Sequence, residues 1–264
     1  MIKTLAIRAS LAWLGPERTS QMACWSHLAY WKAVKQLRTY ANRHADKRCF
    51  IIGNGPSLRK MDLAPLKNEI TFGLNRIYLL FDSIGFTTTY HVTCNNYVIE
   101  QCAEEIAKLP CPKFVGWHAR HLMPSTPNTV FLRSRSGPRF CTDIAADGVW
   151  EGATVTFVAM QIAYYMGFRK VILIGVDHSF QTKGTPHELV VSEGDDPNHF
   201  HPNYFGKGFR WNLPDLETSE LAYNLARRQF ELAGREILDA TVEGKLQVFP
   251  KVDYEKLFKD PERG

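Results

Sequence analysis

The stretch from Phe50 to Leu58 reads Phe-Ile-Ile-Gly-Asn-Gly-Pro-Ser-Leu, and it constrains the fold more than any other part of the chain. An apolar run ending at Ile52 predicts a buried strand, and the strand leads directly into a turn with two glycines. Gly53 and Gly55 permit positive φ and a close approach to the backbone, and Pro56 suits the first turn of a helix. Because exposed N–H groups and the helix dipole point outward at such a junction, it favours anions. We therefore expect an α/β fold with a nucleotide phosphate at this turn.

The turn matches neither of the two common phosphate-binding motifs. In Gly-x-Gly-x-x-Gly the third glycine would fall at Leu58, and no acid follows near Tyr78 to hold a ribose. No Gly-Lys-Ser/Thr follows either, which argues against a Walker A loop. Asn54 and Ser57 add side-chain hydrogen-bonding groups that neither motif requires. A tight strand-to-helix turn without a ligand remains the simpler reading of these residues.

Length and cysteine content indicate one α/β domain in a reducing compartment. A chain of 264 residues buries a sizeable core. No apolar run reaches the roughly 18 residues that cross a bilayer. The six cysteines include no Cys-x-x-Cys pair and lie largely within apolar patterns, which favours buried thiols and a cytoplasmic location and indicates no zinc site.

The positive charge is concentrated at the N-terminus. Residues 1–48 carry nine Lys/Arg against two acids, whereas the whole chain has a net charge of only +5. We expect residues 1–47 to form a basic, aromatic helical extension, with a helix over residues 20–43 that lies on the anionic inner face of a membrane. Packing of this helix on the domain, or on a second subunit of a homo-oligomer, is the other interpretation. Residues 1–14 are short and apolar, but they lack the clean core and cleavage site of a signal peptide.

From Arg48 onward, strand and helix patterns alternate, which predicts a mostly parallel sheet with helices on both faces. The expected strands are Cys49–Ile52, Ile70–Leu74, Thr89–Cys94, Lys113–Val115, Thr129–Leu132, Val171–Ile174 and Leu246–Phe249. The expected helices are Tyr97–Lys108, Thr154–Met166 and Glu217–Ala233. The helix before Gly167 is apolar nearly all round, so it should be central and end at that glycine. Residues 48–264 would thus form one catalytic domain.

Residues 179–215 interrupt this alternation. They are rich in His, Pro, Gly, Asn and Asp and include four aromatics between Tyr204 and Trp211. A segment of this length without periodicity is usually a functional lid or a disordered insertion. Because it follows the strand Val171–Ile174, it belongs on the carboxyl side of the sheet, where open α/β folds bind ligands. Its aromatics favour an ordered lid.

Polar residues follow the ends of several predicted strands. Asn54, Asn75 and Asn95 follow the first three, so their amides should surround one nucleotide, although an asparagine at a strand end is also a common turn former. Asp177 and His178 follow a later strand. Asp177 would bind a metal, orient His178, hold a sugar hydroxyl or serve as a cap.

The predicted lid contains two histidines, His199 and His201, in the sequence Asn198-His-Phe-His-Pro-Asn-Tyr-Phe205. Histidine titrates near neutrality and is the usual general base. A structural role and a zinc site with Asp195, Asp196 or His187 are the other interpretations, but this spacing matches no standard zinc site. No Asp-x-Asp pair occurs anywhere in the chain. We therefore expect no metal and no cofactor beyond the donor nucleotide.

Several of these motifs resemble one group of enzymes. The segment Phe50–Leu58, the Asn75 strand end, Gly167–Asp177 and Asn198–Phe200 resemble the bacterial sialyltransferases of glycosyltransferase family 42. They are closer still to the domain of unknown function 115 group, which includes flagellin nonulosonate transferases and proteins similar to the pterin diphosphokinase MptE. The similarity covers roughly residues 48–250. It implies a single Rossmann-like domain.

The resemblance also implies roles for individual residues. The donor, a CMP-sugar in the sialyltransferases, would be held by Gly53, Asn54, Gly55, Ser57, Asn75, Asn95 and Thr154. The base would be a lid histidine shortly after a His-aromatic pair. His199-Phe200 matches that pair and His201 is the nearest later histidine, so we favour His201, followed by His199, with His178 and Asp177 in reserve. The two tyrosines that assist the leaving phosphate in that family correspond to positions near Ser179 and Thr185.

Together these features predict a metal-independent glycosyltransferase that uses a nucleotide-activated, CMP-linked, sialic-acid-like sugar to modify a surface glycan or glycolipid. Nucleic acid is not an expected partner. The first alternative is a 6-hydroxymethylpterin diphosphokinase that transfers pyrophosphate from ATP with Mg²⁺. The second alternative is a non-catalytic nucleotide-binding protein associated with the membrane.

Overall fold

A computed structural model describes residues 28–124, 126–181 and 184–259. Within these residues seven parallel strands form the main sheet, in the order β11-β8-β1-β2-β3-β4-β5. The strands are β1 (Arg48–Ile52), β2 (Thr71–Leu74), β3 (Tyr90–Thr93), β4 (Lys113–Gly116), β5 (Thr129–Leu132), β8 (Lys170–Ile174) and β11 (Glu236–Asp239). Two small pairs lie outside it, β6 (Ser134–Arg135) with β7 (Val149–Trp150) and β9 (Leu189–Val191) with β10 (Arg210–Asn212). The predicted parallel α/β fold is confirmed.

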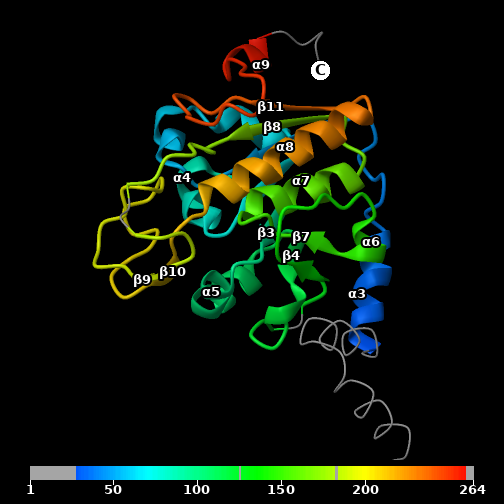
Figure 1. The fold of residues 1–264 in the computed structure, drawn as a ribbon, viewed down its shortest axis with the longest axis horizontal. Coiled ribbons are helices and arrows are strands. Elements are labelled where there is room, and N and C mark those ends of the chain that lie inside the picture. The colour runs from blue at the N-terminus through cyan, green and yellow to red at the C-terminus, as the bar shows by residue number, and fades with distance from the viewer. Residues whose placement is uncertain (1–27, 125, 182–183, 260–264) are drawn as a thin grey trace, which may run out of the picture.

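Both faces of the sheet are covered, which explains why its central strands are continuously apolar. Alternate residues of β1 enter opposite cores: Cys49 and Ile51 pack on one side, and Phe50 and Ile52 on the other. Helices α7 (Val155–Tyr165) and α8 (Leu216–Leu232) lie against each other on the first side (Figure 1). Helix α5 (Asn96–Lys108) and the aromatics of the segment 179–215 pack on the second side.

The remaining helices are short, apart from α3 (Leu28–Arg38). They are α4 (Phe81–Ile84), α6 (Ile144–Asp147), α9 (Lys256–Lys259) and the 3₁₀ helices η1 (Pro56–Lys60), η2 (Ala64–Asn68), η3 (Ile77–Leu80) and η4 (Trp117–Ala119). The central position of α7 is as predicted: it is buried at every residue from Thr156 to Ala163, and Gly167 follows its end with a φ of 88°. All five described cysteines are free and buried.

Two sequence predictions need correction. Leu246–Phe249 is not a strand, although Leu246 and Phe249 are buried in the core. The strand at that edge is β11, whose Ile237 and Leu238 stand between two acids and so give only a weak apolar signal. Its last residue, Asp239, is fully buried and is neutralised by the ammonium group of Lys251 at 2.6 Å.

The second correction concerns the N-terminal helix, expected over residues 20–43. The described part ends at Arg38 and is followed by turns up to Asp46. Its buried residues Tyr30, Ala33, Val34 and Leu37 pack on the domain near β5 and α6, as in the packed-helix interpretation. Residues 1–27, with the signal-peptide region and the start of this helix, lie outside the described residues. No described helix has the length and apolarity needed to cross a bilayer.

Candidate functional site

A cavity of about 620 Å³ opens at the carboxyl ends of β1 and β8. The chain proceeds outward from β1 through β2 to β5 and then returns to β8 on the other side of β1. The order of strands therefore reverses between β1 and β8, and this is where open α/β sheets bind ligands. The cavity is lined by nine of the predicted site residues: Gly53, Asn54, Gly55, Asn75, Asn95, Thr154, Asp177, His178 and His199. Ser57 and His201 are not part of its wall.

The two glycines let the turn after β1 contact the turn after β8. The N–H of Gly53 donates to the carbonyl of Ile174, and that of Gly55 to the carbonyl of Gly175, both at 2.8 Å. A Cβ on Gly55 would lie 1.7 Å from Oδ2 of Asp177. Gly55 has a φ of −69°, so of the two properties that we expected of it, the close approach is used and the positive φ is not.

The carboxylate of Asp177 accepts hydrogen bonds from Ser57, in the turn that was predicted to bind a phosphate. Its Oδ1 accepts the backbone N–H of Ser57 at 3.1 Å, and its Oδ2 accepts the Ser57 hydroxyl at 2.7 Å. Burial raises the pKa of Asp177, and the hydrogen bonds from Ser57 oppose that shift. The helix after the turn is the five-residue 3₁₀ helix η1 and not an α-helix. Asp177 thus joins the two turns, and Ser57 serves that contact instead of facing the cavity.

The three strand-end asparagines converge on the cavity but differ in their hydrogen bonds. Oδ1 of Asn54 is buried and has no partner among the described residues. Asn75 has a φ of 47°, and its Oδ1 accepts the hydroxyl of Thr93 at 3.2 Å. Asn95 caps α5 by accepting the N–H of Val98 at 3.1 Å. Asn54 therefore has the clearest unmet hydrogen-bonding capacity, because a buried polar group without a partner is costly.

Thr154 caps the buried helix α7 at the cavity wall. Its Oγ1 accepts the N–H of Thr156 at 3.3 Å and lies 3.4 Å from the hydroxyl of Tyr223. The residues around it, Ala153 to Thr156, all line the cavity. The positive end of the α7 dipole consequently faces the site.

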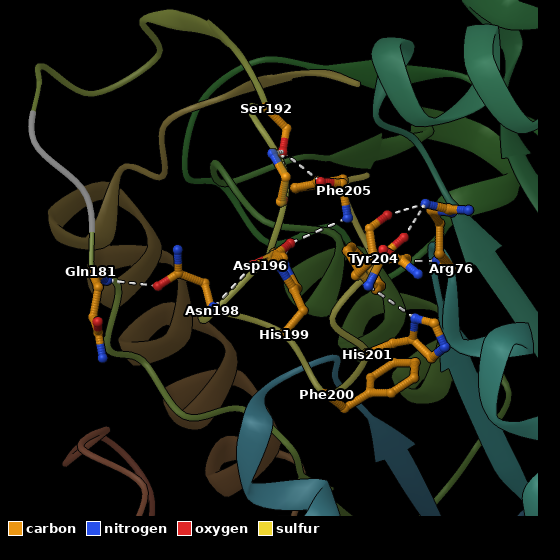
Figure 2. A network of polar contacts seen from close by, with 12 residues as sticks. Arg76, Gln181, Ser192, Asp196, Asn198, His199, Phe200, His201, Tyr204 and Phe205 are labelled. Carbon is orange, nitrogen blue, oxygen red and sulfur yellow. Dashed lines mark hydrogen bonds and ion pairs between the residues drawn. The ribbon is translucent and has the colours of Figure 1, made fainter. Parts of the chain in front are cut away.

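His199 lines the cavity and forms a buried pair with Asp196 of the lid (Figure 2). Nδ1 of His199 lies 2.7 Å from Oδ2 of Asp196. Because a carboxylate accepts, Nδ1 carries the proton and leaves Nε2 able to accept one. The ring stacks on Tyr204, with centroids 4.0 Å apart and an interplanar angle of 8°. Sequence reasoning considered Asp196 only as a zinc ligand, whereas the fold makes it the residue that orients His199.

Hydrogen bonds attach this pair to the turn after β1. The N–H of Phe200 donates to the carbonyl of Asn54 at 2.9 Å. The guanidinium of Arg59 donates from Nε to the carbonyl of Phe200 and from Nη2 to that of His199, each at 2.7 Å. Arg76 donates to the carbonyl of Tyr204 (Figure 2). This part of the lid is therefore held against the turn after β1.

The other two predicted histidines have different surroundings. His201 lies outside the cavity, where its Nδ1 accepts the N–H of Asn203 at 3.2 Å. His178 lines the cavity with a φ of 53°, and its Nε2 lies 2.9 Å from Oε1 of Glu220. Among the three, His199 is the one that lines the cavity and has a ring nitrogen held by a buried carboxylate. We had narrowly favoured His201, and its position instead favours His199.

A second polar region lines the cavity and was not predicted. It contains His118, Ser134, Arg135 and Glu151, from segments around β4, β6 and β7. Nδ1 of His118 lies 3.3 Å from the hydroxyl of Ser134. Burial lowers the pKa of His118, and the carboxylate of Glu151 opposes that shift. These residues lack a motif because three separate segments supply them. Nowhere in the described ranges do three or more His, Cys, Asp or Glu side chains gather as a metal site would require.

Comparison with known proteins places the chain in a family. No curated protein matches it. The structure of the MAf glycosyltransferase from Magnetospirillum magneticum AMB-1 is similar to this one, with a TM-score of 0.50 and 12% sequence identity. The similarity covers 81% of this chain and 35% of that chain, and at this identity it establishes the shared fold.

A family model gives a more direct assignment. The model for 6-hydroxymethylpterin diphosphokinase MptE-like proteins matches residues 25–183, which is more than half of the chain. This range contains the turn after β1, all three strand-end asparagines, helix α7 and Asp177. The chain therefore belongs to the 6-hydroxymethylpterin diphosphokinase MptE-like family.

Proposed function

We propose that this protein transfers a sugar from a nucleotide-activated donor to a hydroxyl group, with His199 as the general base. The observation that carries the proposal is the buried His199–Asp196 pair, whose imidazole lines the cavity at the strand-order reversal. A sugar hydroxyl is a poor nucleophile until a neighbouring group removes its proton. Asp196 holds His199 in the tautomer that accepts this proton at Nε2.

The donor would occupy the cavity floor. Asn54 offers a buried Oδ1 without a partner, Asn75 offers its amide NH₂, and Thr154 stands at the start of α7. An amide pairs with both donors and acceptors of a base or ribose. We propose a CMP-linked, sialic-acid-like sugar as donor and a surface glycan or glycolipid as acceptor, because of the resemblance in the β1 turn and the strand-end asparagines.

The reaction needs one proton transfer and one displacement. The acceptor hydroxyl loses its proton to Nε2 of His199 as its oxygen bonds to the anomeric carbon. The bond between that carbon and the phosphate oxygen breaks, and the nucleotide leaves with the bonding electron pair. The imidazolium formed at His199 is stabilised by the adjacent carboxylate of Asp196.

The main test is turnover and nucleotide affinity of the full chain. Thermal shift with CMP, CDP, UDP, GDP and ATP, with and without Mg²⁺, identifies the donor, and transfer is then measured with the matching sugar nucleotide. His199→Ala should lower kcat by ~10²–10⁴ and leave donor affinity nearly unchanged. His201→Ala, two residues away and outside the cavity, is the matched control. A turnover loss of only a few-fold in His199→Ala would show that the proton goes elsewhere.

The family description favours a second candidate, pyrophosphoryl transfer from ATP to a pterin alcohol. Glu151, Asp177 and Asp215 are the carboxylates on the cavity wall, and Asp177 and Asp215 already accept hydrogen bonds from Ser57 and Thr218. The two functions give different products and different metal dependence. Sugar transfer that persists in excess EDTA supports the first, whereas AMP formation from ATP that requires Mg²⁺ supports the second.

A further inference from the structure

In the proposed reaction the cavity must stabilise a phosphate, and the turn after β1 supplies no positive charge for it. Its Ser57 N–H and hydroxyl both donate to the carboxylate of Asp177, which would repel an anion. Glycosyl transfer releases a nucleoside phosphate whose negative charge grows as the bond to the sugar breaks. Fixed positive groups aimed at that charge lower the barrier.

Arg135 is the one Lys or Arg among the described residues that line the cavity. Its Nε is buried without a hydrogen-bond partner, and its guanidinium makes no ion pair within the described ranges. The guanidinium carbon lies 5.5 Å from the ring centroid of Trp150, which supports the side chain from one side. A buried donor without a partner is expensive unless a ligand satisfies it.

The backbone places Arg135 beside the start of α7. Strand β6 pairs with β7, and the N–H of Glu151 donates to the carbonyl of Arg135 at 2.9 Å. Three residues later Thr154 caps α7, an 11-residue helix whose first residues also line the cavity. The guanidinium and the positive end of this helix consequently belong to one wall of the cavity.

We infer that Arg135 binds the phosphate of the nucleotide and stabilises it as the leaving group. This inference rests on the proposed glycosyl transfer for its catalytic part, whereas phosphate binding by Arg135 stands without it. In the reaction, the oxygen that separates from the anomeric carbon keeps the electron pair, and its charge is balanced by the guanidinium. Arginine suits this role because its planar fork binds two phosphate oxygens at once.

The experiment compares Arg135→Ala and Arg135→Lys with Arg139→Ala in the full-length protein. Arg139 is the matched control, because its guanidinium carbon also lies near Trp150, at 5.3 Å, yet it does not line the cavity. Calorimetry measures affinity for inorganic pyrophosphate, CMP and cytidine, and the transfer assay measures kcat. Near-native circular dichroism and melting temperature establish that each variant is folded.

We expect Arg135→Ala to weaken pyrophosphate and CMP binding at least tenfold, while cytidine binding is unchanged. Arg135→Lys should recover part of the affinity, and Arg139→Ala should behave as the unmodified chain. Equal pyrophosphate affinity in Arg135→Ala and the unmodified chain, or no pyrophosphate binding by either, would overturn the inference. Pyrophosphate binding that depends on Arg135 without any sugar transfer would sustain the phosphate site and refute the proposed function.

Discussion

His91 should make the protein unstable in mild acid. It lies on β3 with 0% exposure, and neither ring nitrogen has a hydrogen-bond partner among the described residues. Burial, assisted by the nearby ammonium group of Lys113, lowers the pKa of His91 to about 3. In the unfolded chain a histidine has a pKa of about 6.5. Below pH 6.5 the unfolded state therefore takes up a proton that the folded state does not, and the free energy of unfolding decreases as the pH falls.

The size of the effect follows from these two pKa values. At pH 7.5 the histidine is neutral in both states and contributes almost nothing. At pH 5 protonation of the unfolded chain lowers the free energy of unfolding by about 2 kcal/mol, and the full difference approaches about 5 kcal/mol below pH 3. This is a large fraction of the stability of an ordinary domain.

The assay is urea unfolding at pH 7.5 and pH 5.0 for the unmodified chain, His91→Leu and His91→Met. Both substitutions remove the titrating group, and neither leaves a former partner unpaired. The stability lost between the two pH values should be about 2 kcal/mol smaller in both variants than in the unmodified chain. His121→Gln, at an exposed histidine, should leave the pH dependence unchanged. An identical loss in the unmodified chain and both His91 variants would refute the reasoning.

Three further outcomes are expected. Arg59→Ala removes two hydrogen bonds from a guanidinium to the lid, so hydrogen exchange at the Phe200 amide should accelerate tenfold or more, whereas Lys60→Ala should have no such effect. Equal protection of this amide in both variants would show that Arg59 does not order the lid. Gly55→Ala should displace the Asp177 carboxylate and lower the free energy of unfolding, measured by urea titration, by about 3 kcal/mol. Gly206→Ala is the control and should change it little, because the nearest atom is 3.9 Å from the added Cβ. The full chain should bind anionic vesicles in a salt-sensitive way. The double substitution Lys32→Glu and Lys35→Glu, on the exposed side of α3, should reduce the fraction of protein recovered with floating vesicles. Undiminished recovery would argue against the basic helix as a membrane contact.

The amino-acid sequence alone determined the parts of the fold that depend on local pattern. The apolar runs predicted six strands of the main sheet, because a strand buried on both faces is apolar throughout. The all-round apolarity of residues 155–165 predicted a central helix. Gly53, Asn54 and Gly55 marked the turn at which the strand order reverses, since few other residues allow two backbones to approach so closely.

Tertiary structure decided which side chains meet. Ser57 and Asp177 are 120 residues apart in the sequence, and their contact depends on β8 returning beside β1. His199 and His201 are chemically alike. Only the stacking of His199 on Tyr204 within the lid and the hydrogen bond from Phe200 to Asn54 place the first in the cavity and the second outside it. Arg135 stands on a two-residue strand without a motif, and it reaches the cavity because β6 pairs with β7 ahead of α7. Pairing between distant segments leaves no periodic trace in the sequence, because it is set by topology and packing and not by the preferences of neighbouring residues.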